Sequence, residues 1–311
     1  MSGFIDLQVN GYAGVDFNSD ELSEADLVAA CTELACDGVE QTLATIITAP
    51  MDQMVSRITR IADWIESVPE IRKQIAGIHV EGPFISPVDG FVGAHPKAAV
   101  QLATADAAER LLDAGNGHVR LVTLAPEMDS GAAVTRFLRD RSVVVAAGHS
   151  DASVDELDRC IDAGLGLYTH LGNGCPSQLH RHDNIIQRVL SRSDRLMISF
   201  VADGHHVPTF ALRNYLRCMP TENVVIVSDA IAAAGLGPGE YQLAGQTVYV
   251  DDDGAAWAEC RTHFAGCATT LPKMREILIR DLGATTTEIN AWMRDNPKRL
   301  LGYTPATSAA L

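Results

Sequence analysis

Eight short runs of apolar and β-branched residues recur along this chain, and a stretch with helical periodicity separates each run from the next. The runs span residues 4–9, 40–48, 75–81, 119–125, 143–149, 166–171, 196–203 and 223–230. Between them, apolar residues recur at three- and four-residue steps, as in SEADLVAACTELACDG, which is typical of amphipathic helices. Strands that alternate with helices form right-handed β-α-β units around a parallel sheet. Eight such units predict an α/β fold of the (β/α)8 TIM-barrel type.

A doubly wound open sheet is the alternative for such an alternation. That fold usually carries a glycine-rich turn after its first strand, where a nucleotide binds. Here the first run leads into QVNGYAGVDF, which does not match, and the GLGPGEY segment follows the last run instead. The barrel is therefore favoured. After the eighth run, residues 240–260 interrupt the alternation and predict an inserted β-hairpin with an Asp-Asp-Gly turn.

The length of 311 residues, 47% of them hydrophobic, allows a substantial core. We expect residues 1–303 to form a single barrel domain and residues 304–311 to be a frayed tail. No stretch is apolar enough to cross a membrane, so no membrane association is expected. The first residues, MSGFIDLQVNG, lack the basic region and apolar core of a signal peptide, which predicts a cytoplasmic protein.

Charge and cysteine content exclude other classes of function. The formal net charge is −16, from 24 basic and 40 acidic residues, and Lys and Arg form no cluster. A nucleic-acid partner is therefore not expected. The seven cysteines include no C-x-x-C pair, which argues against a disulfide framework or a structural zinc knot.

Polar residues stand at the ends of five predicted strands. In a TIM barrel the carboxyl ends of the strands carry the catalytic groups. Any one of these residues alone could be a cap or a hydrogen-bonded core group, but their joint placement favours a site. They are Asp6, Gln8 and Asn10 on the first strand, Glu81 on the third, His149 on the fifth, His170 on the sixth and Asp229 on the eighth.

Glu81, His149 and His170 form a plausible cation site with a position left open for water. Two imidazoles and a carboxylate suit Zn²⁺, and Fe²⁺ is also tolerated. Such an ion would polarise a substrate carbonyl and lower the pKa of a bound water. Asp229 could then accept the proton of that water and pass it to a leaving group.

Six segments in order resemble the motifs of N-acetylglucosamine-6-phosphate deacetylases, a family of the amidohydrolase superfamily. They are GFIDLQVNG, GIHVEGPF, AGHSDAS, YTHLGNG, VADGHHV and VSDA. The resemblance implies a metal-dependent hydrolase that removes the N-acetyl group of N-acetylglucosamine 6-phosphate or of a close amino-sugar phosphate. It implies metal ligation by Glu81, His149 and His170, and an acid/base role for Asp229. It also implies a homodimer.

Further residues take roles by the same resemblance. His95 corresponds to a histidine near the acetyl group, and His206 to a sugar-binding histidine. Arg181 falls where relatives place a phosphate-binding arginine, although it could also be a solvated loop residue. Asn173 and Gly174 fall where backbone groups approach the ligand.

The first strand bears on the number of metal ions. Many amidohydrolases carry H-x-H there, whereas this chain has Gln8-Val9-Asn10. Amides are poor ligands for a transition metal, so one catalytic ion is expected. Gln8 and Asn10 are then either weak ligands and ligand-supporting groups, or hydrogen-bonding residues of the strand end.

Departures from the family pattern leave other functions open. The small β-sandwich that relatives build from flanking segments is expected to be missing or to have been trimmed, and HLGNGCPSQLHRHDN and FAGCATTL differ from the usual loops. The same metal site could hydrolyse another amide, such as an N-acyl amino acid or a cyclic amide. A sugar-phosphate-binding barrel without catalysis is a further alternative.

Overall fold

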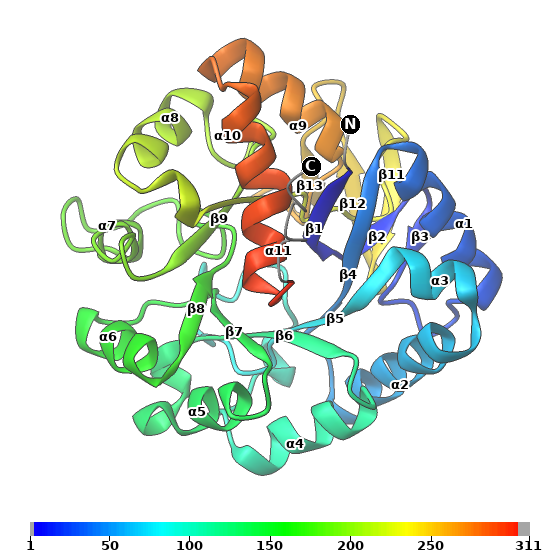
Figure 1. The fold of residues 1–311 in the computed structure, drawn as a ribbon, viewed down its shortest axis with the longest axis horizontal. Coiled ribbons are helices and arrows are strands. Elements are labelled where there is room, and N and C mark those ends of the chain that lie inside the picture. The colour runs from blue at the N-terminus through cyan, green and yellow to red at the C-terminus, as the bar shows by residue number, and fades with distance from the viewer. Residues whose placement is uncertain (1–2, 304–311) are drawn as a thin grey trace, which may run out of the picture.

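A computed structural model describes residues 3–303 and contains an eight-stranded parallel barrel, as predicted. The strand order is β1-β4-β5-β6-β7-β8-β9-β10. Figure 1 shows these strands at the centre of the molecule and the helices around them. The strands are β1 (Phe4–Val9), β4 (Val39–Ile47), β5 (Ile75–Glu81), β6 (Val119–Leu124), β7 (Val144–Ala147), β8 (Leu165–Tyr168), β9 (Met197–Val201) and β10 (Val224–Val227).

The barrel closes between its first and last strands. Val9 forms a parallel bridge with Ala230, and the backbone N–H of Asn10 donates to the carbonyl of Ala230 at 2.7 Å. The backbone N–H of Ser228 donates to Oδ1 of Asp6 at 3.1 Å. These bonds hold the end of β1 beside the end of β10, so polar residues that follow the two strands lie at one rim.

The helices lie on the outside because each buries one apolar face against the strands. They are α1 (Glu24–Cys36), α2 (Met51–Ser67), α3 (Pro69–Gln74), α4 (Ala105–Ala114), α5 (Ala133–Arg139), α6 (Val154–Ala163), α7 (Ile185–Leu190), α8 (Thr209–Arg217), α9 (Leu271–Ile277), α10 (Thr286–Asn290) and α11 (Asn296–Leu300). In α6, Leu157, Cys160 and Ala163 are buried, which is the three-residue step of a helix face. Ser153 caps this helix, and Glu156 completes a capping box.

The excursion after β10 has one strand more than the predicted hairpin. A three-stranded antiparallel sheet contains β11 (Gly239–Leu243), β12 (Gln246–Val250) and β13 (Ala256–Ala258). The extra pairing uses a two-residue turn in which Ala244 has φ 49° and Gly245 has φ 81°. Positive φ at both central residues gives the turn twist that hairpin strands favour, and alanine at the first position hides this signal in the sequence.

Smaller elements complete the described part of the chain. The strands β2 (Gly11–Tyr12) and β3 (Val15–Asp16) form a two-stranded ribbon directly after β1. None of the helices within residues 3–303 combines the length and the apolar character needed to span a membrane. The predicted tail at 304–311 lies outside the described residues.

Candidate metal centre and active site

Three of the predicted site residues follow their strands by two positions and adopt left-handed backbone conformations. The φ angles are 51° at His149, 34° at His170 and 51° at Asp229, although non-glycine residues rarely have positive φ. The predicted strands at 143–149, 166–171 and 223–230 are therefore too long at their carboxyl ends. Backbone strain of this kind costs about 1–3 kcal/mol per residue and clusters at functional sites.

Glu81 lies between two of the predicted histidines. Its Oε1 atom is 2.8 Å from Nε2 of His170 and 3.4 Å from Nε2 of His149. All three side chains are buried, and the rings of His149 and His170 are 4.9 Å apart. The structure therefore brings together the three residues that the sequence assigns to the metal.

A neighbouring carbonyl group fixes the orientation of His149. Its Nδ1 atom is 2.9 Å from the backbone carbonyl oxygen of Phe91, so Nδ1 carries a proton and Nε2 is the ring nitrogen that faces Glu81 and that a cation would bind. Gly174 lies against the same ring, where a Cβ atom would approach Nδ1 of His149 to 2.7 Å. Glycine at this position therefore leaves room for the imidazole.

His95 joins the cluster more closely than the sequence suggests. Its Nε2 atom lies 3.2 Å from Nε2 of His149, and potential ligand atoms of Glu81, His95 and His149 all lie within 4.8 Å of one another. The Nδ1 atom of His95 is buried without a hydrogen-bond partner. Burial and the neighbouring His149 lower the pKa of His95 to about 3, so the ring is neutral at neutral pH.

The cluster fits a divalent cation. Imidazole nitrogens and a carboxylate oxygen converge on one volume, and Nδ1 of His170 is a second buried ring nitrogen without a partner. Burial raises the pKa of Glu81, but hydrogen bonds from His149 and His170 outweigh it and hold the pKa well below the usual value. A buried ionised carboxylate needs a positive partner, and a cation supplies one.

Gln8 connects Glu81 to Asp229 through its amide nitrogen. Nε2 of Gln8 donates to Oε1 of Glu81 at 3.0 Å and to Oδ1 of Asp229 at 3.1 Å. Its Oε1 atom accepts a hydrogen bond from Thr169 at 2.6 Å. If the side-chain amide of Gln8 were flipped, its oxygen would face the carboxylates of Glu81 and Asp229 and be repelled by them. The orientation with Nε2 toward the carboxylates is therefore the stable one. Gln8 therefore presents a donor to the cluster and no metal-binding lone pair.

Asn10 lies on the other side of Asp229. Its Nδ2 atom donates to Oδ1 of Asp229 at 2.8 Å, while its own Oδ1 is buried without a partner. Burial and the charge of Glu81 raise the pKa of Asp229 above the usual value. A carboxyl group with a raised pKa is suited to accept and return a proton near neutral pH.

His206 is held by an acid that the sequence does not assign to the site. Oδ2 of Asp203 lies 2.6 Å from Nδ1 of His206, and Oδ1 of Asp203 accepts from the backbone N–H groups of His205 and His206, both at 2.9 Å. Burial lowers the pKa of His206, but the charge and hydrogen bond of Asp203 outweigh it and raise the pKa. The sequence signal is the three-residue spacing between the two side chains.

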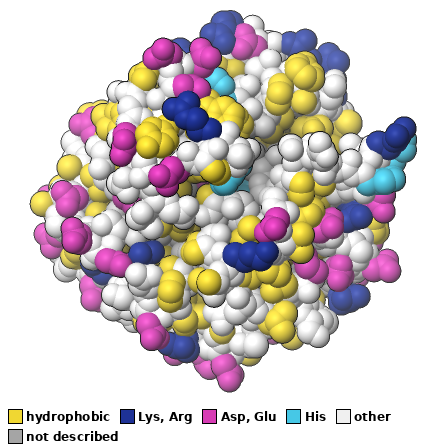
Figure 2. All heavy atoms as spheres, turned by 180° about the vertical axis from the view of Figure 1, so that it is seen from behind, with side chains coloured by type: hydrophobic (Ala, Val, Ile, Leu, Met, Phe, Trp, Pro, Cys, Tyr) yellow, Lys and Arg dark blue, Asp and Glu magenta, His cyan; other side chains and the backbone are white. Residues whose placement is uncertain are grey.

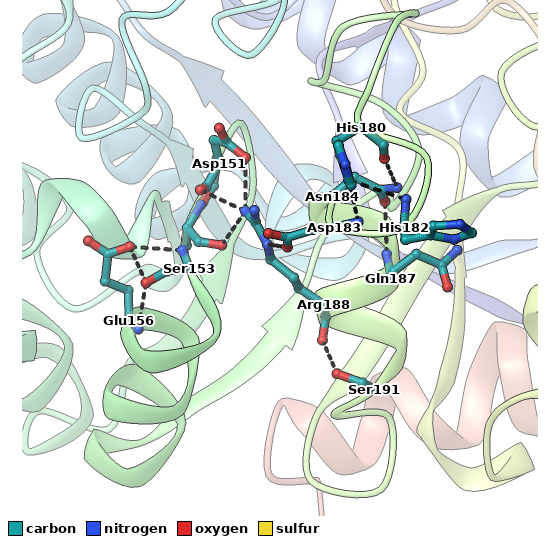
Figure 3. A network of polar contacts seen from close by, with 12 residues as sticks. Asp151, Ser153, Glu156, His180, His182, Asp183, Asn184, Gln187, Arg188 and Ser191 are labelled. Carbon is teal, nitrogen blue, oxygen red and sulfur yellow. Dashed lines mark hydrogen bonds and ion pairs between the residues drawn. The ribbon is translucent and has the colours of Figure 1, made fainter.

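The loop that carries the other predicted ligand contacts is anchored outside the cluster. Figure 3 shows Arg188 between Asp151 and Asp183, with hydrogen bonds of 3.0 Å and 2.6 Å to their carboxylates. Asn173 is adjacent to the cluster, since its backbone N–H donates to the carbonyl of His170 at 2.9 Å, and its buried Nδ2 has no partner. Arg181 is exposed on this loop and is not brought to the cluster.

A cavity of about 1060 Å³ adjoins the cluster at His95. The β2–β3 ribbon, the start of α2 and the β11–β12 turn line it, and Asp16, Thr48 and Gln246 contribute side chains to its wall. On the face seen in Figure 2, the surface is hollowed near its centre and a histidine side chain is visible there. His95 therefore lies between the cluster and a volume large enough for a small molecule.

Comparison with known proteins finds relatives of this chain. No family model matches the chain. The chain is 36% identical over 260 residues to the human N-acetylglucosamine-6-phosphate deacetylase, a match that covers 80% of this chain and 61% of the relative. The chain is related to the N-acetylglucosamine-6-phosphate deacetylases. The resemblance predicted from the motifs is thereby confirmed.

Other relatives agree. The N-acetylgalactosamine-6-phosphate deacetylase of Escherichia coli O157:H7 is 29% identical over 299 residues, which is 96% of this chain and 77% of that protein. The solved structure of a variant deacetylase from Mycobacterium smegmatis, in complex with N-acetyl-D-glucosamine-6-phosphate, has a TM-score of 0.87 and 27% identity. The superposition covers 97% of this chain and 77% of the Mycobacterium smegmatis chain. The chain spans about 61% of the length of the bovine and human relatives.

Proposed function

We propose that this protein hydrolyses the N-acetyl group of an amino-sugar 6-phosphate, with N-acetylglucosamine 6-phosphate as the first candidate. The observation that carries the proposal is the convergence of His149 and His170 on Glu81, with Asp229 joined to Glu81 through the amide of Gln8. The names of the relatives support the substrate class. Hydrolysis gives acetate and the free amine.

Glu81, His149 and His170 would hold one divalent cation, and their donor set favours Zn²⁺. When bound, the cation polarises the amide carbonyl and lowers the pKa of a coordinated water. His95 is neutral and lies 3.2 Å from His149, where it could donate a hydrogen bond to the developing oxyanion. A role for His95 as an additional ligand has the same geometric support.

Asp229 moves the proton. Its carboxylate removes one proton from the attacking water and returns it to the amine as the C–N bond breaks. Gln8 and Asn10 both donate to Oδ1 of Asp229, so Oδ2 is the oxygen that exchanges the proton. Burial and the charge of Glu81 raise the pKa of Asp229. The carboxylate is therefore a stronger base than an exposed aspartate, as proton transfer near neutral pH requires.

Binding of the sugar phosphate would use residues around the cluster. His206, held by Asp203, and the unpartnered amide of Asn173 are available for hydroxyl groups. Gly174 leaves its backbone accessible beside His149. The guanidinium of Arg181 suits a phosphate group. Because Arg181 is exposed on its loop, the loop would have to move for this side chain to contact the ligand.

Acetate release from purified protein tests the proposal. N-acetylglucosamine 6-phosphate, N-acetylgalactosamine 6-phosphate and unphosphorylated N-acetylglucosamine are compared at equal concentrations. We expect hydrolysis of a phosphorylated sugar and a KM that rises in Arg181→Gln for that sugar alone. Arg110→Gln, which lies on an exposed helix and pairs with Asp52, is the matched control. Turnover of N-acyl amino acids or cyclic amides without turnover of sugar phosphates would refute the proposal.

A further inference from the structure

A second group of potential metal ligands lies beside Asp229. It consists of Asp203, His206 and Cys267, whose ligand atoms all lie within 4.8 Å of one another. Oδ2 of Asp203 is 2.6 Å from Nδ1 of His206 and 3.5 Å from Sγ of Cys267. The side chains are buried. This group shares no member with Glu81, His149 and His170.

The backbone holds the three ligands in place. Oδ1 of Asp203 is occupied by two backbone N–H groups, so Oδ2 is the oxygen that faces the other two residues. The segment of Cys267 is paired in parallel with residues 229–231, because its N–H donates to the carbonyl of Asp229 at 2.9 Å and its carbonyl accepts from the N–H of Ile231 at 3.0 Å. Ligands on a fixed backbone bind a metal with little reorganisation.

The chemistry of the group differs from that of the first cluster. A thiol, an imidazole and a carboxylate are ligands that Zn²⁺ takes, and the thiol selects soft cations over Mg²⁺ or Ca²⁺. Ligand–ion distances of about 2.0–2.3 Å require the 2.6 Å contact between Asp203 and His206 to open by roughly one ångström.

We propose that Asp203, His206 and Cys267 bind a second soft divalent cation, such as Zn²⁺ or Cd²⁺, when it is present in excess. On binding, the thiol of Cys267 loses its proton to solvent, and the proton between Asp203 and His206 is also released. The site is separate from the H-x-H position of the first strand, where Gln8 and Asn10 present amide nitrogens to carboxylates.

Occupation of this site would inhibit the enzyme, a consequence that rests on the proposed function. His206 is a predicted sugar contact. An ion bound to Nδ1 of His206 would separate the ring from Asp203 and hold it in a different position. Excess Zn²⁺ is then expected to raise the KM for the sugar phosphate. The effect is expected to be weaker in Cys267→Ser.

Titration with Co²⁺ tests binding without reference to activity. A cobalt–thiolate bond gives a charge-transfer absorption band in the near ultraviolet. Wild-type protein already loaded with one equivalent of Zn²⁺ is titrated, together with Cys267→Ser, His206→Gln and the control Cys175→Ser. Cys175 lies near the rim but outside both groups of ligands.

We expect the band in wild type and in Cys175→Ser, and its absence in Cys267→Ser. Removal of one ligand is expected to weaken binding of the second ion by at least about 10–100-fold, including in His206→Gln. A band that persists in Cys267→Ser would assign it to the exposed thiols of Cys36, Cys218 and Cys260 and would overturn the proposal. Thermal unfolding confirms that each variant is folded.

The outcome is independent of the proposed function. Loss of the band in Cys267→Ser supports the second site even if no sugar phosphate is hydrolysed. Deacetylation without any band in wild type refutes the second site and leaves the proposed function intact.

Discussion

Asp229 and Glu81 are linked by one amide group, because Nε2 of Gln8 donates to both carboxylates. Burial raises the pKa of Asp229. Repulsion between the negative charges of Glu81 and Asp229 raises it further. The histidines around Glu81 keep that group ionised. The different surroundings of the two carboxylates support the proposed division of roles, with Glu81 for the cation and Asp229 for the proton.

Replacement of Asp229 by Asn tests the proton-transfer role. The amide keeps an oxygen for Gln8 and Asn10 but cannot accept the proton of water. We expect kcat to fall by about 10²–10⁴ while metal content stays at the wild-type level. Asp253→Asn, in the exposed β12–β13 turn, is the control. Wild-type turnover in Asp229→Asn would exclude the role.

Asp6 gives a pH-dependent stability that can be measured. Burial is the main cause that raises its pKa to about 7, whereas an unfolded Asp titrates near 3.9. Because the folded state binds the proton more tightly, stability is lost as pH rises from the unfolded pKa through 7. Asp6→Asn removes this loss and keeps an acceptor for Ser228.

We therefore expect the stability advantage of Asp6→Asn over wild type to grow by about 2 kcal/mol between pH 5.5 and pH 8, since one pKa unit corresponds to about 1.4 kcal/mol. Urea unfolding at the two pH values measures it. A difference that does not change with pH would show that Asp6 has no raised pKa.

The residue types of the site could be predicted from sequence, but their contacts could not. Glu81, His149, His170 and Asp229 stand at predicted strand ends, and parallel strands bring such ends together. The contact of His95 with His149 depends on a long loop with no periodicity. The sequence assigns Asp203 no place in the site, and its contact with His206 is seen only in the structure.

At the scale of elements, three barrel strands end before the proposed site residues. β7, β8 and β10 each stop two positions before His149, His170 or Asp229, and the left-handed turn that follows points the side chain into the mouth. Sequence patterns predict the strands because apolar runs persist over the whole length. They do not predict the turns, because His and Asp adopt positive φ more often than most residues but still do so in only a minority of cases.

Gly266 supports the turn at Asp229 from the neighbouring segment. It has φ 63°, and a Cβ atom there would lie 2.2 Å from Cγ2 of Ile231. Gly266→Ala is expected to lose about 2–4 kcal/mol of stability through overpacking and backbone strain. Gly254→Ala, where φ is 88° and no atom lies within 4 Å, should lose only about 1–2 kcal/mol. Equal unfolding midpoints for the two variants would contradict this account of Gly266.

At the scale of the molecule, the fold follows from the alternation of strands and helices, whereas the assembly does not. The solved deacetylase structure is matched over 97% of this chain, so the described barrel is the part that the chain shares with it. Within residues 3–303, the exposed large apolar side chains are spread over several segments and do not mark a subunit interface.

We predict a homodimer from the resemblance alone. Light scattering coupled to gel filtration should give a mass near twice 33.3 kDa. A mass of one chain over a range of concentrations would contradict the prediction. This outcome would leave the metal centre unaffected, since the residues gathered around Glu81 all come from one chain.

Anomalous diffraction from crystals grown with Zn²⁺ tests the central claim most directly. The account predicts a peak within about 2.0–2.2 Å of Glu81, of Nε2 of His149 and of Nε2 of His170, and its loss in Glu81→Gln. A peak bound only by other residues, or no peak at this cluster in a protein that deacetylates the sugar phosphate, would contradict it.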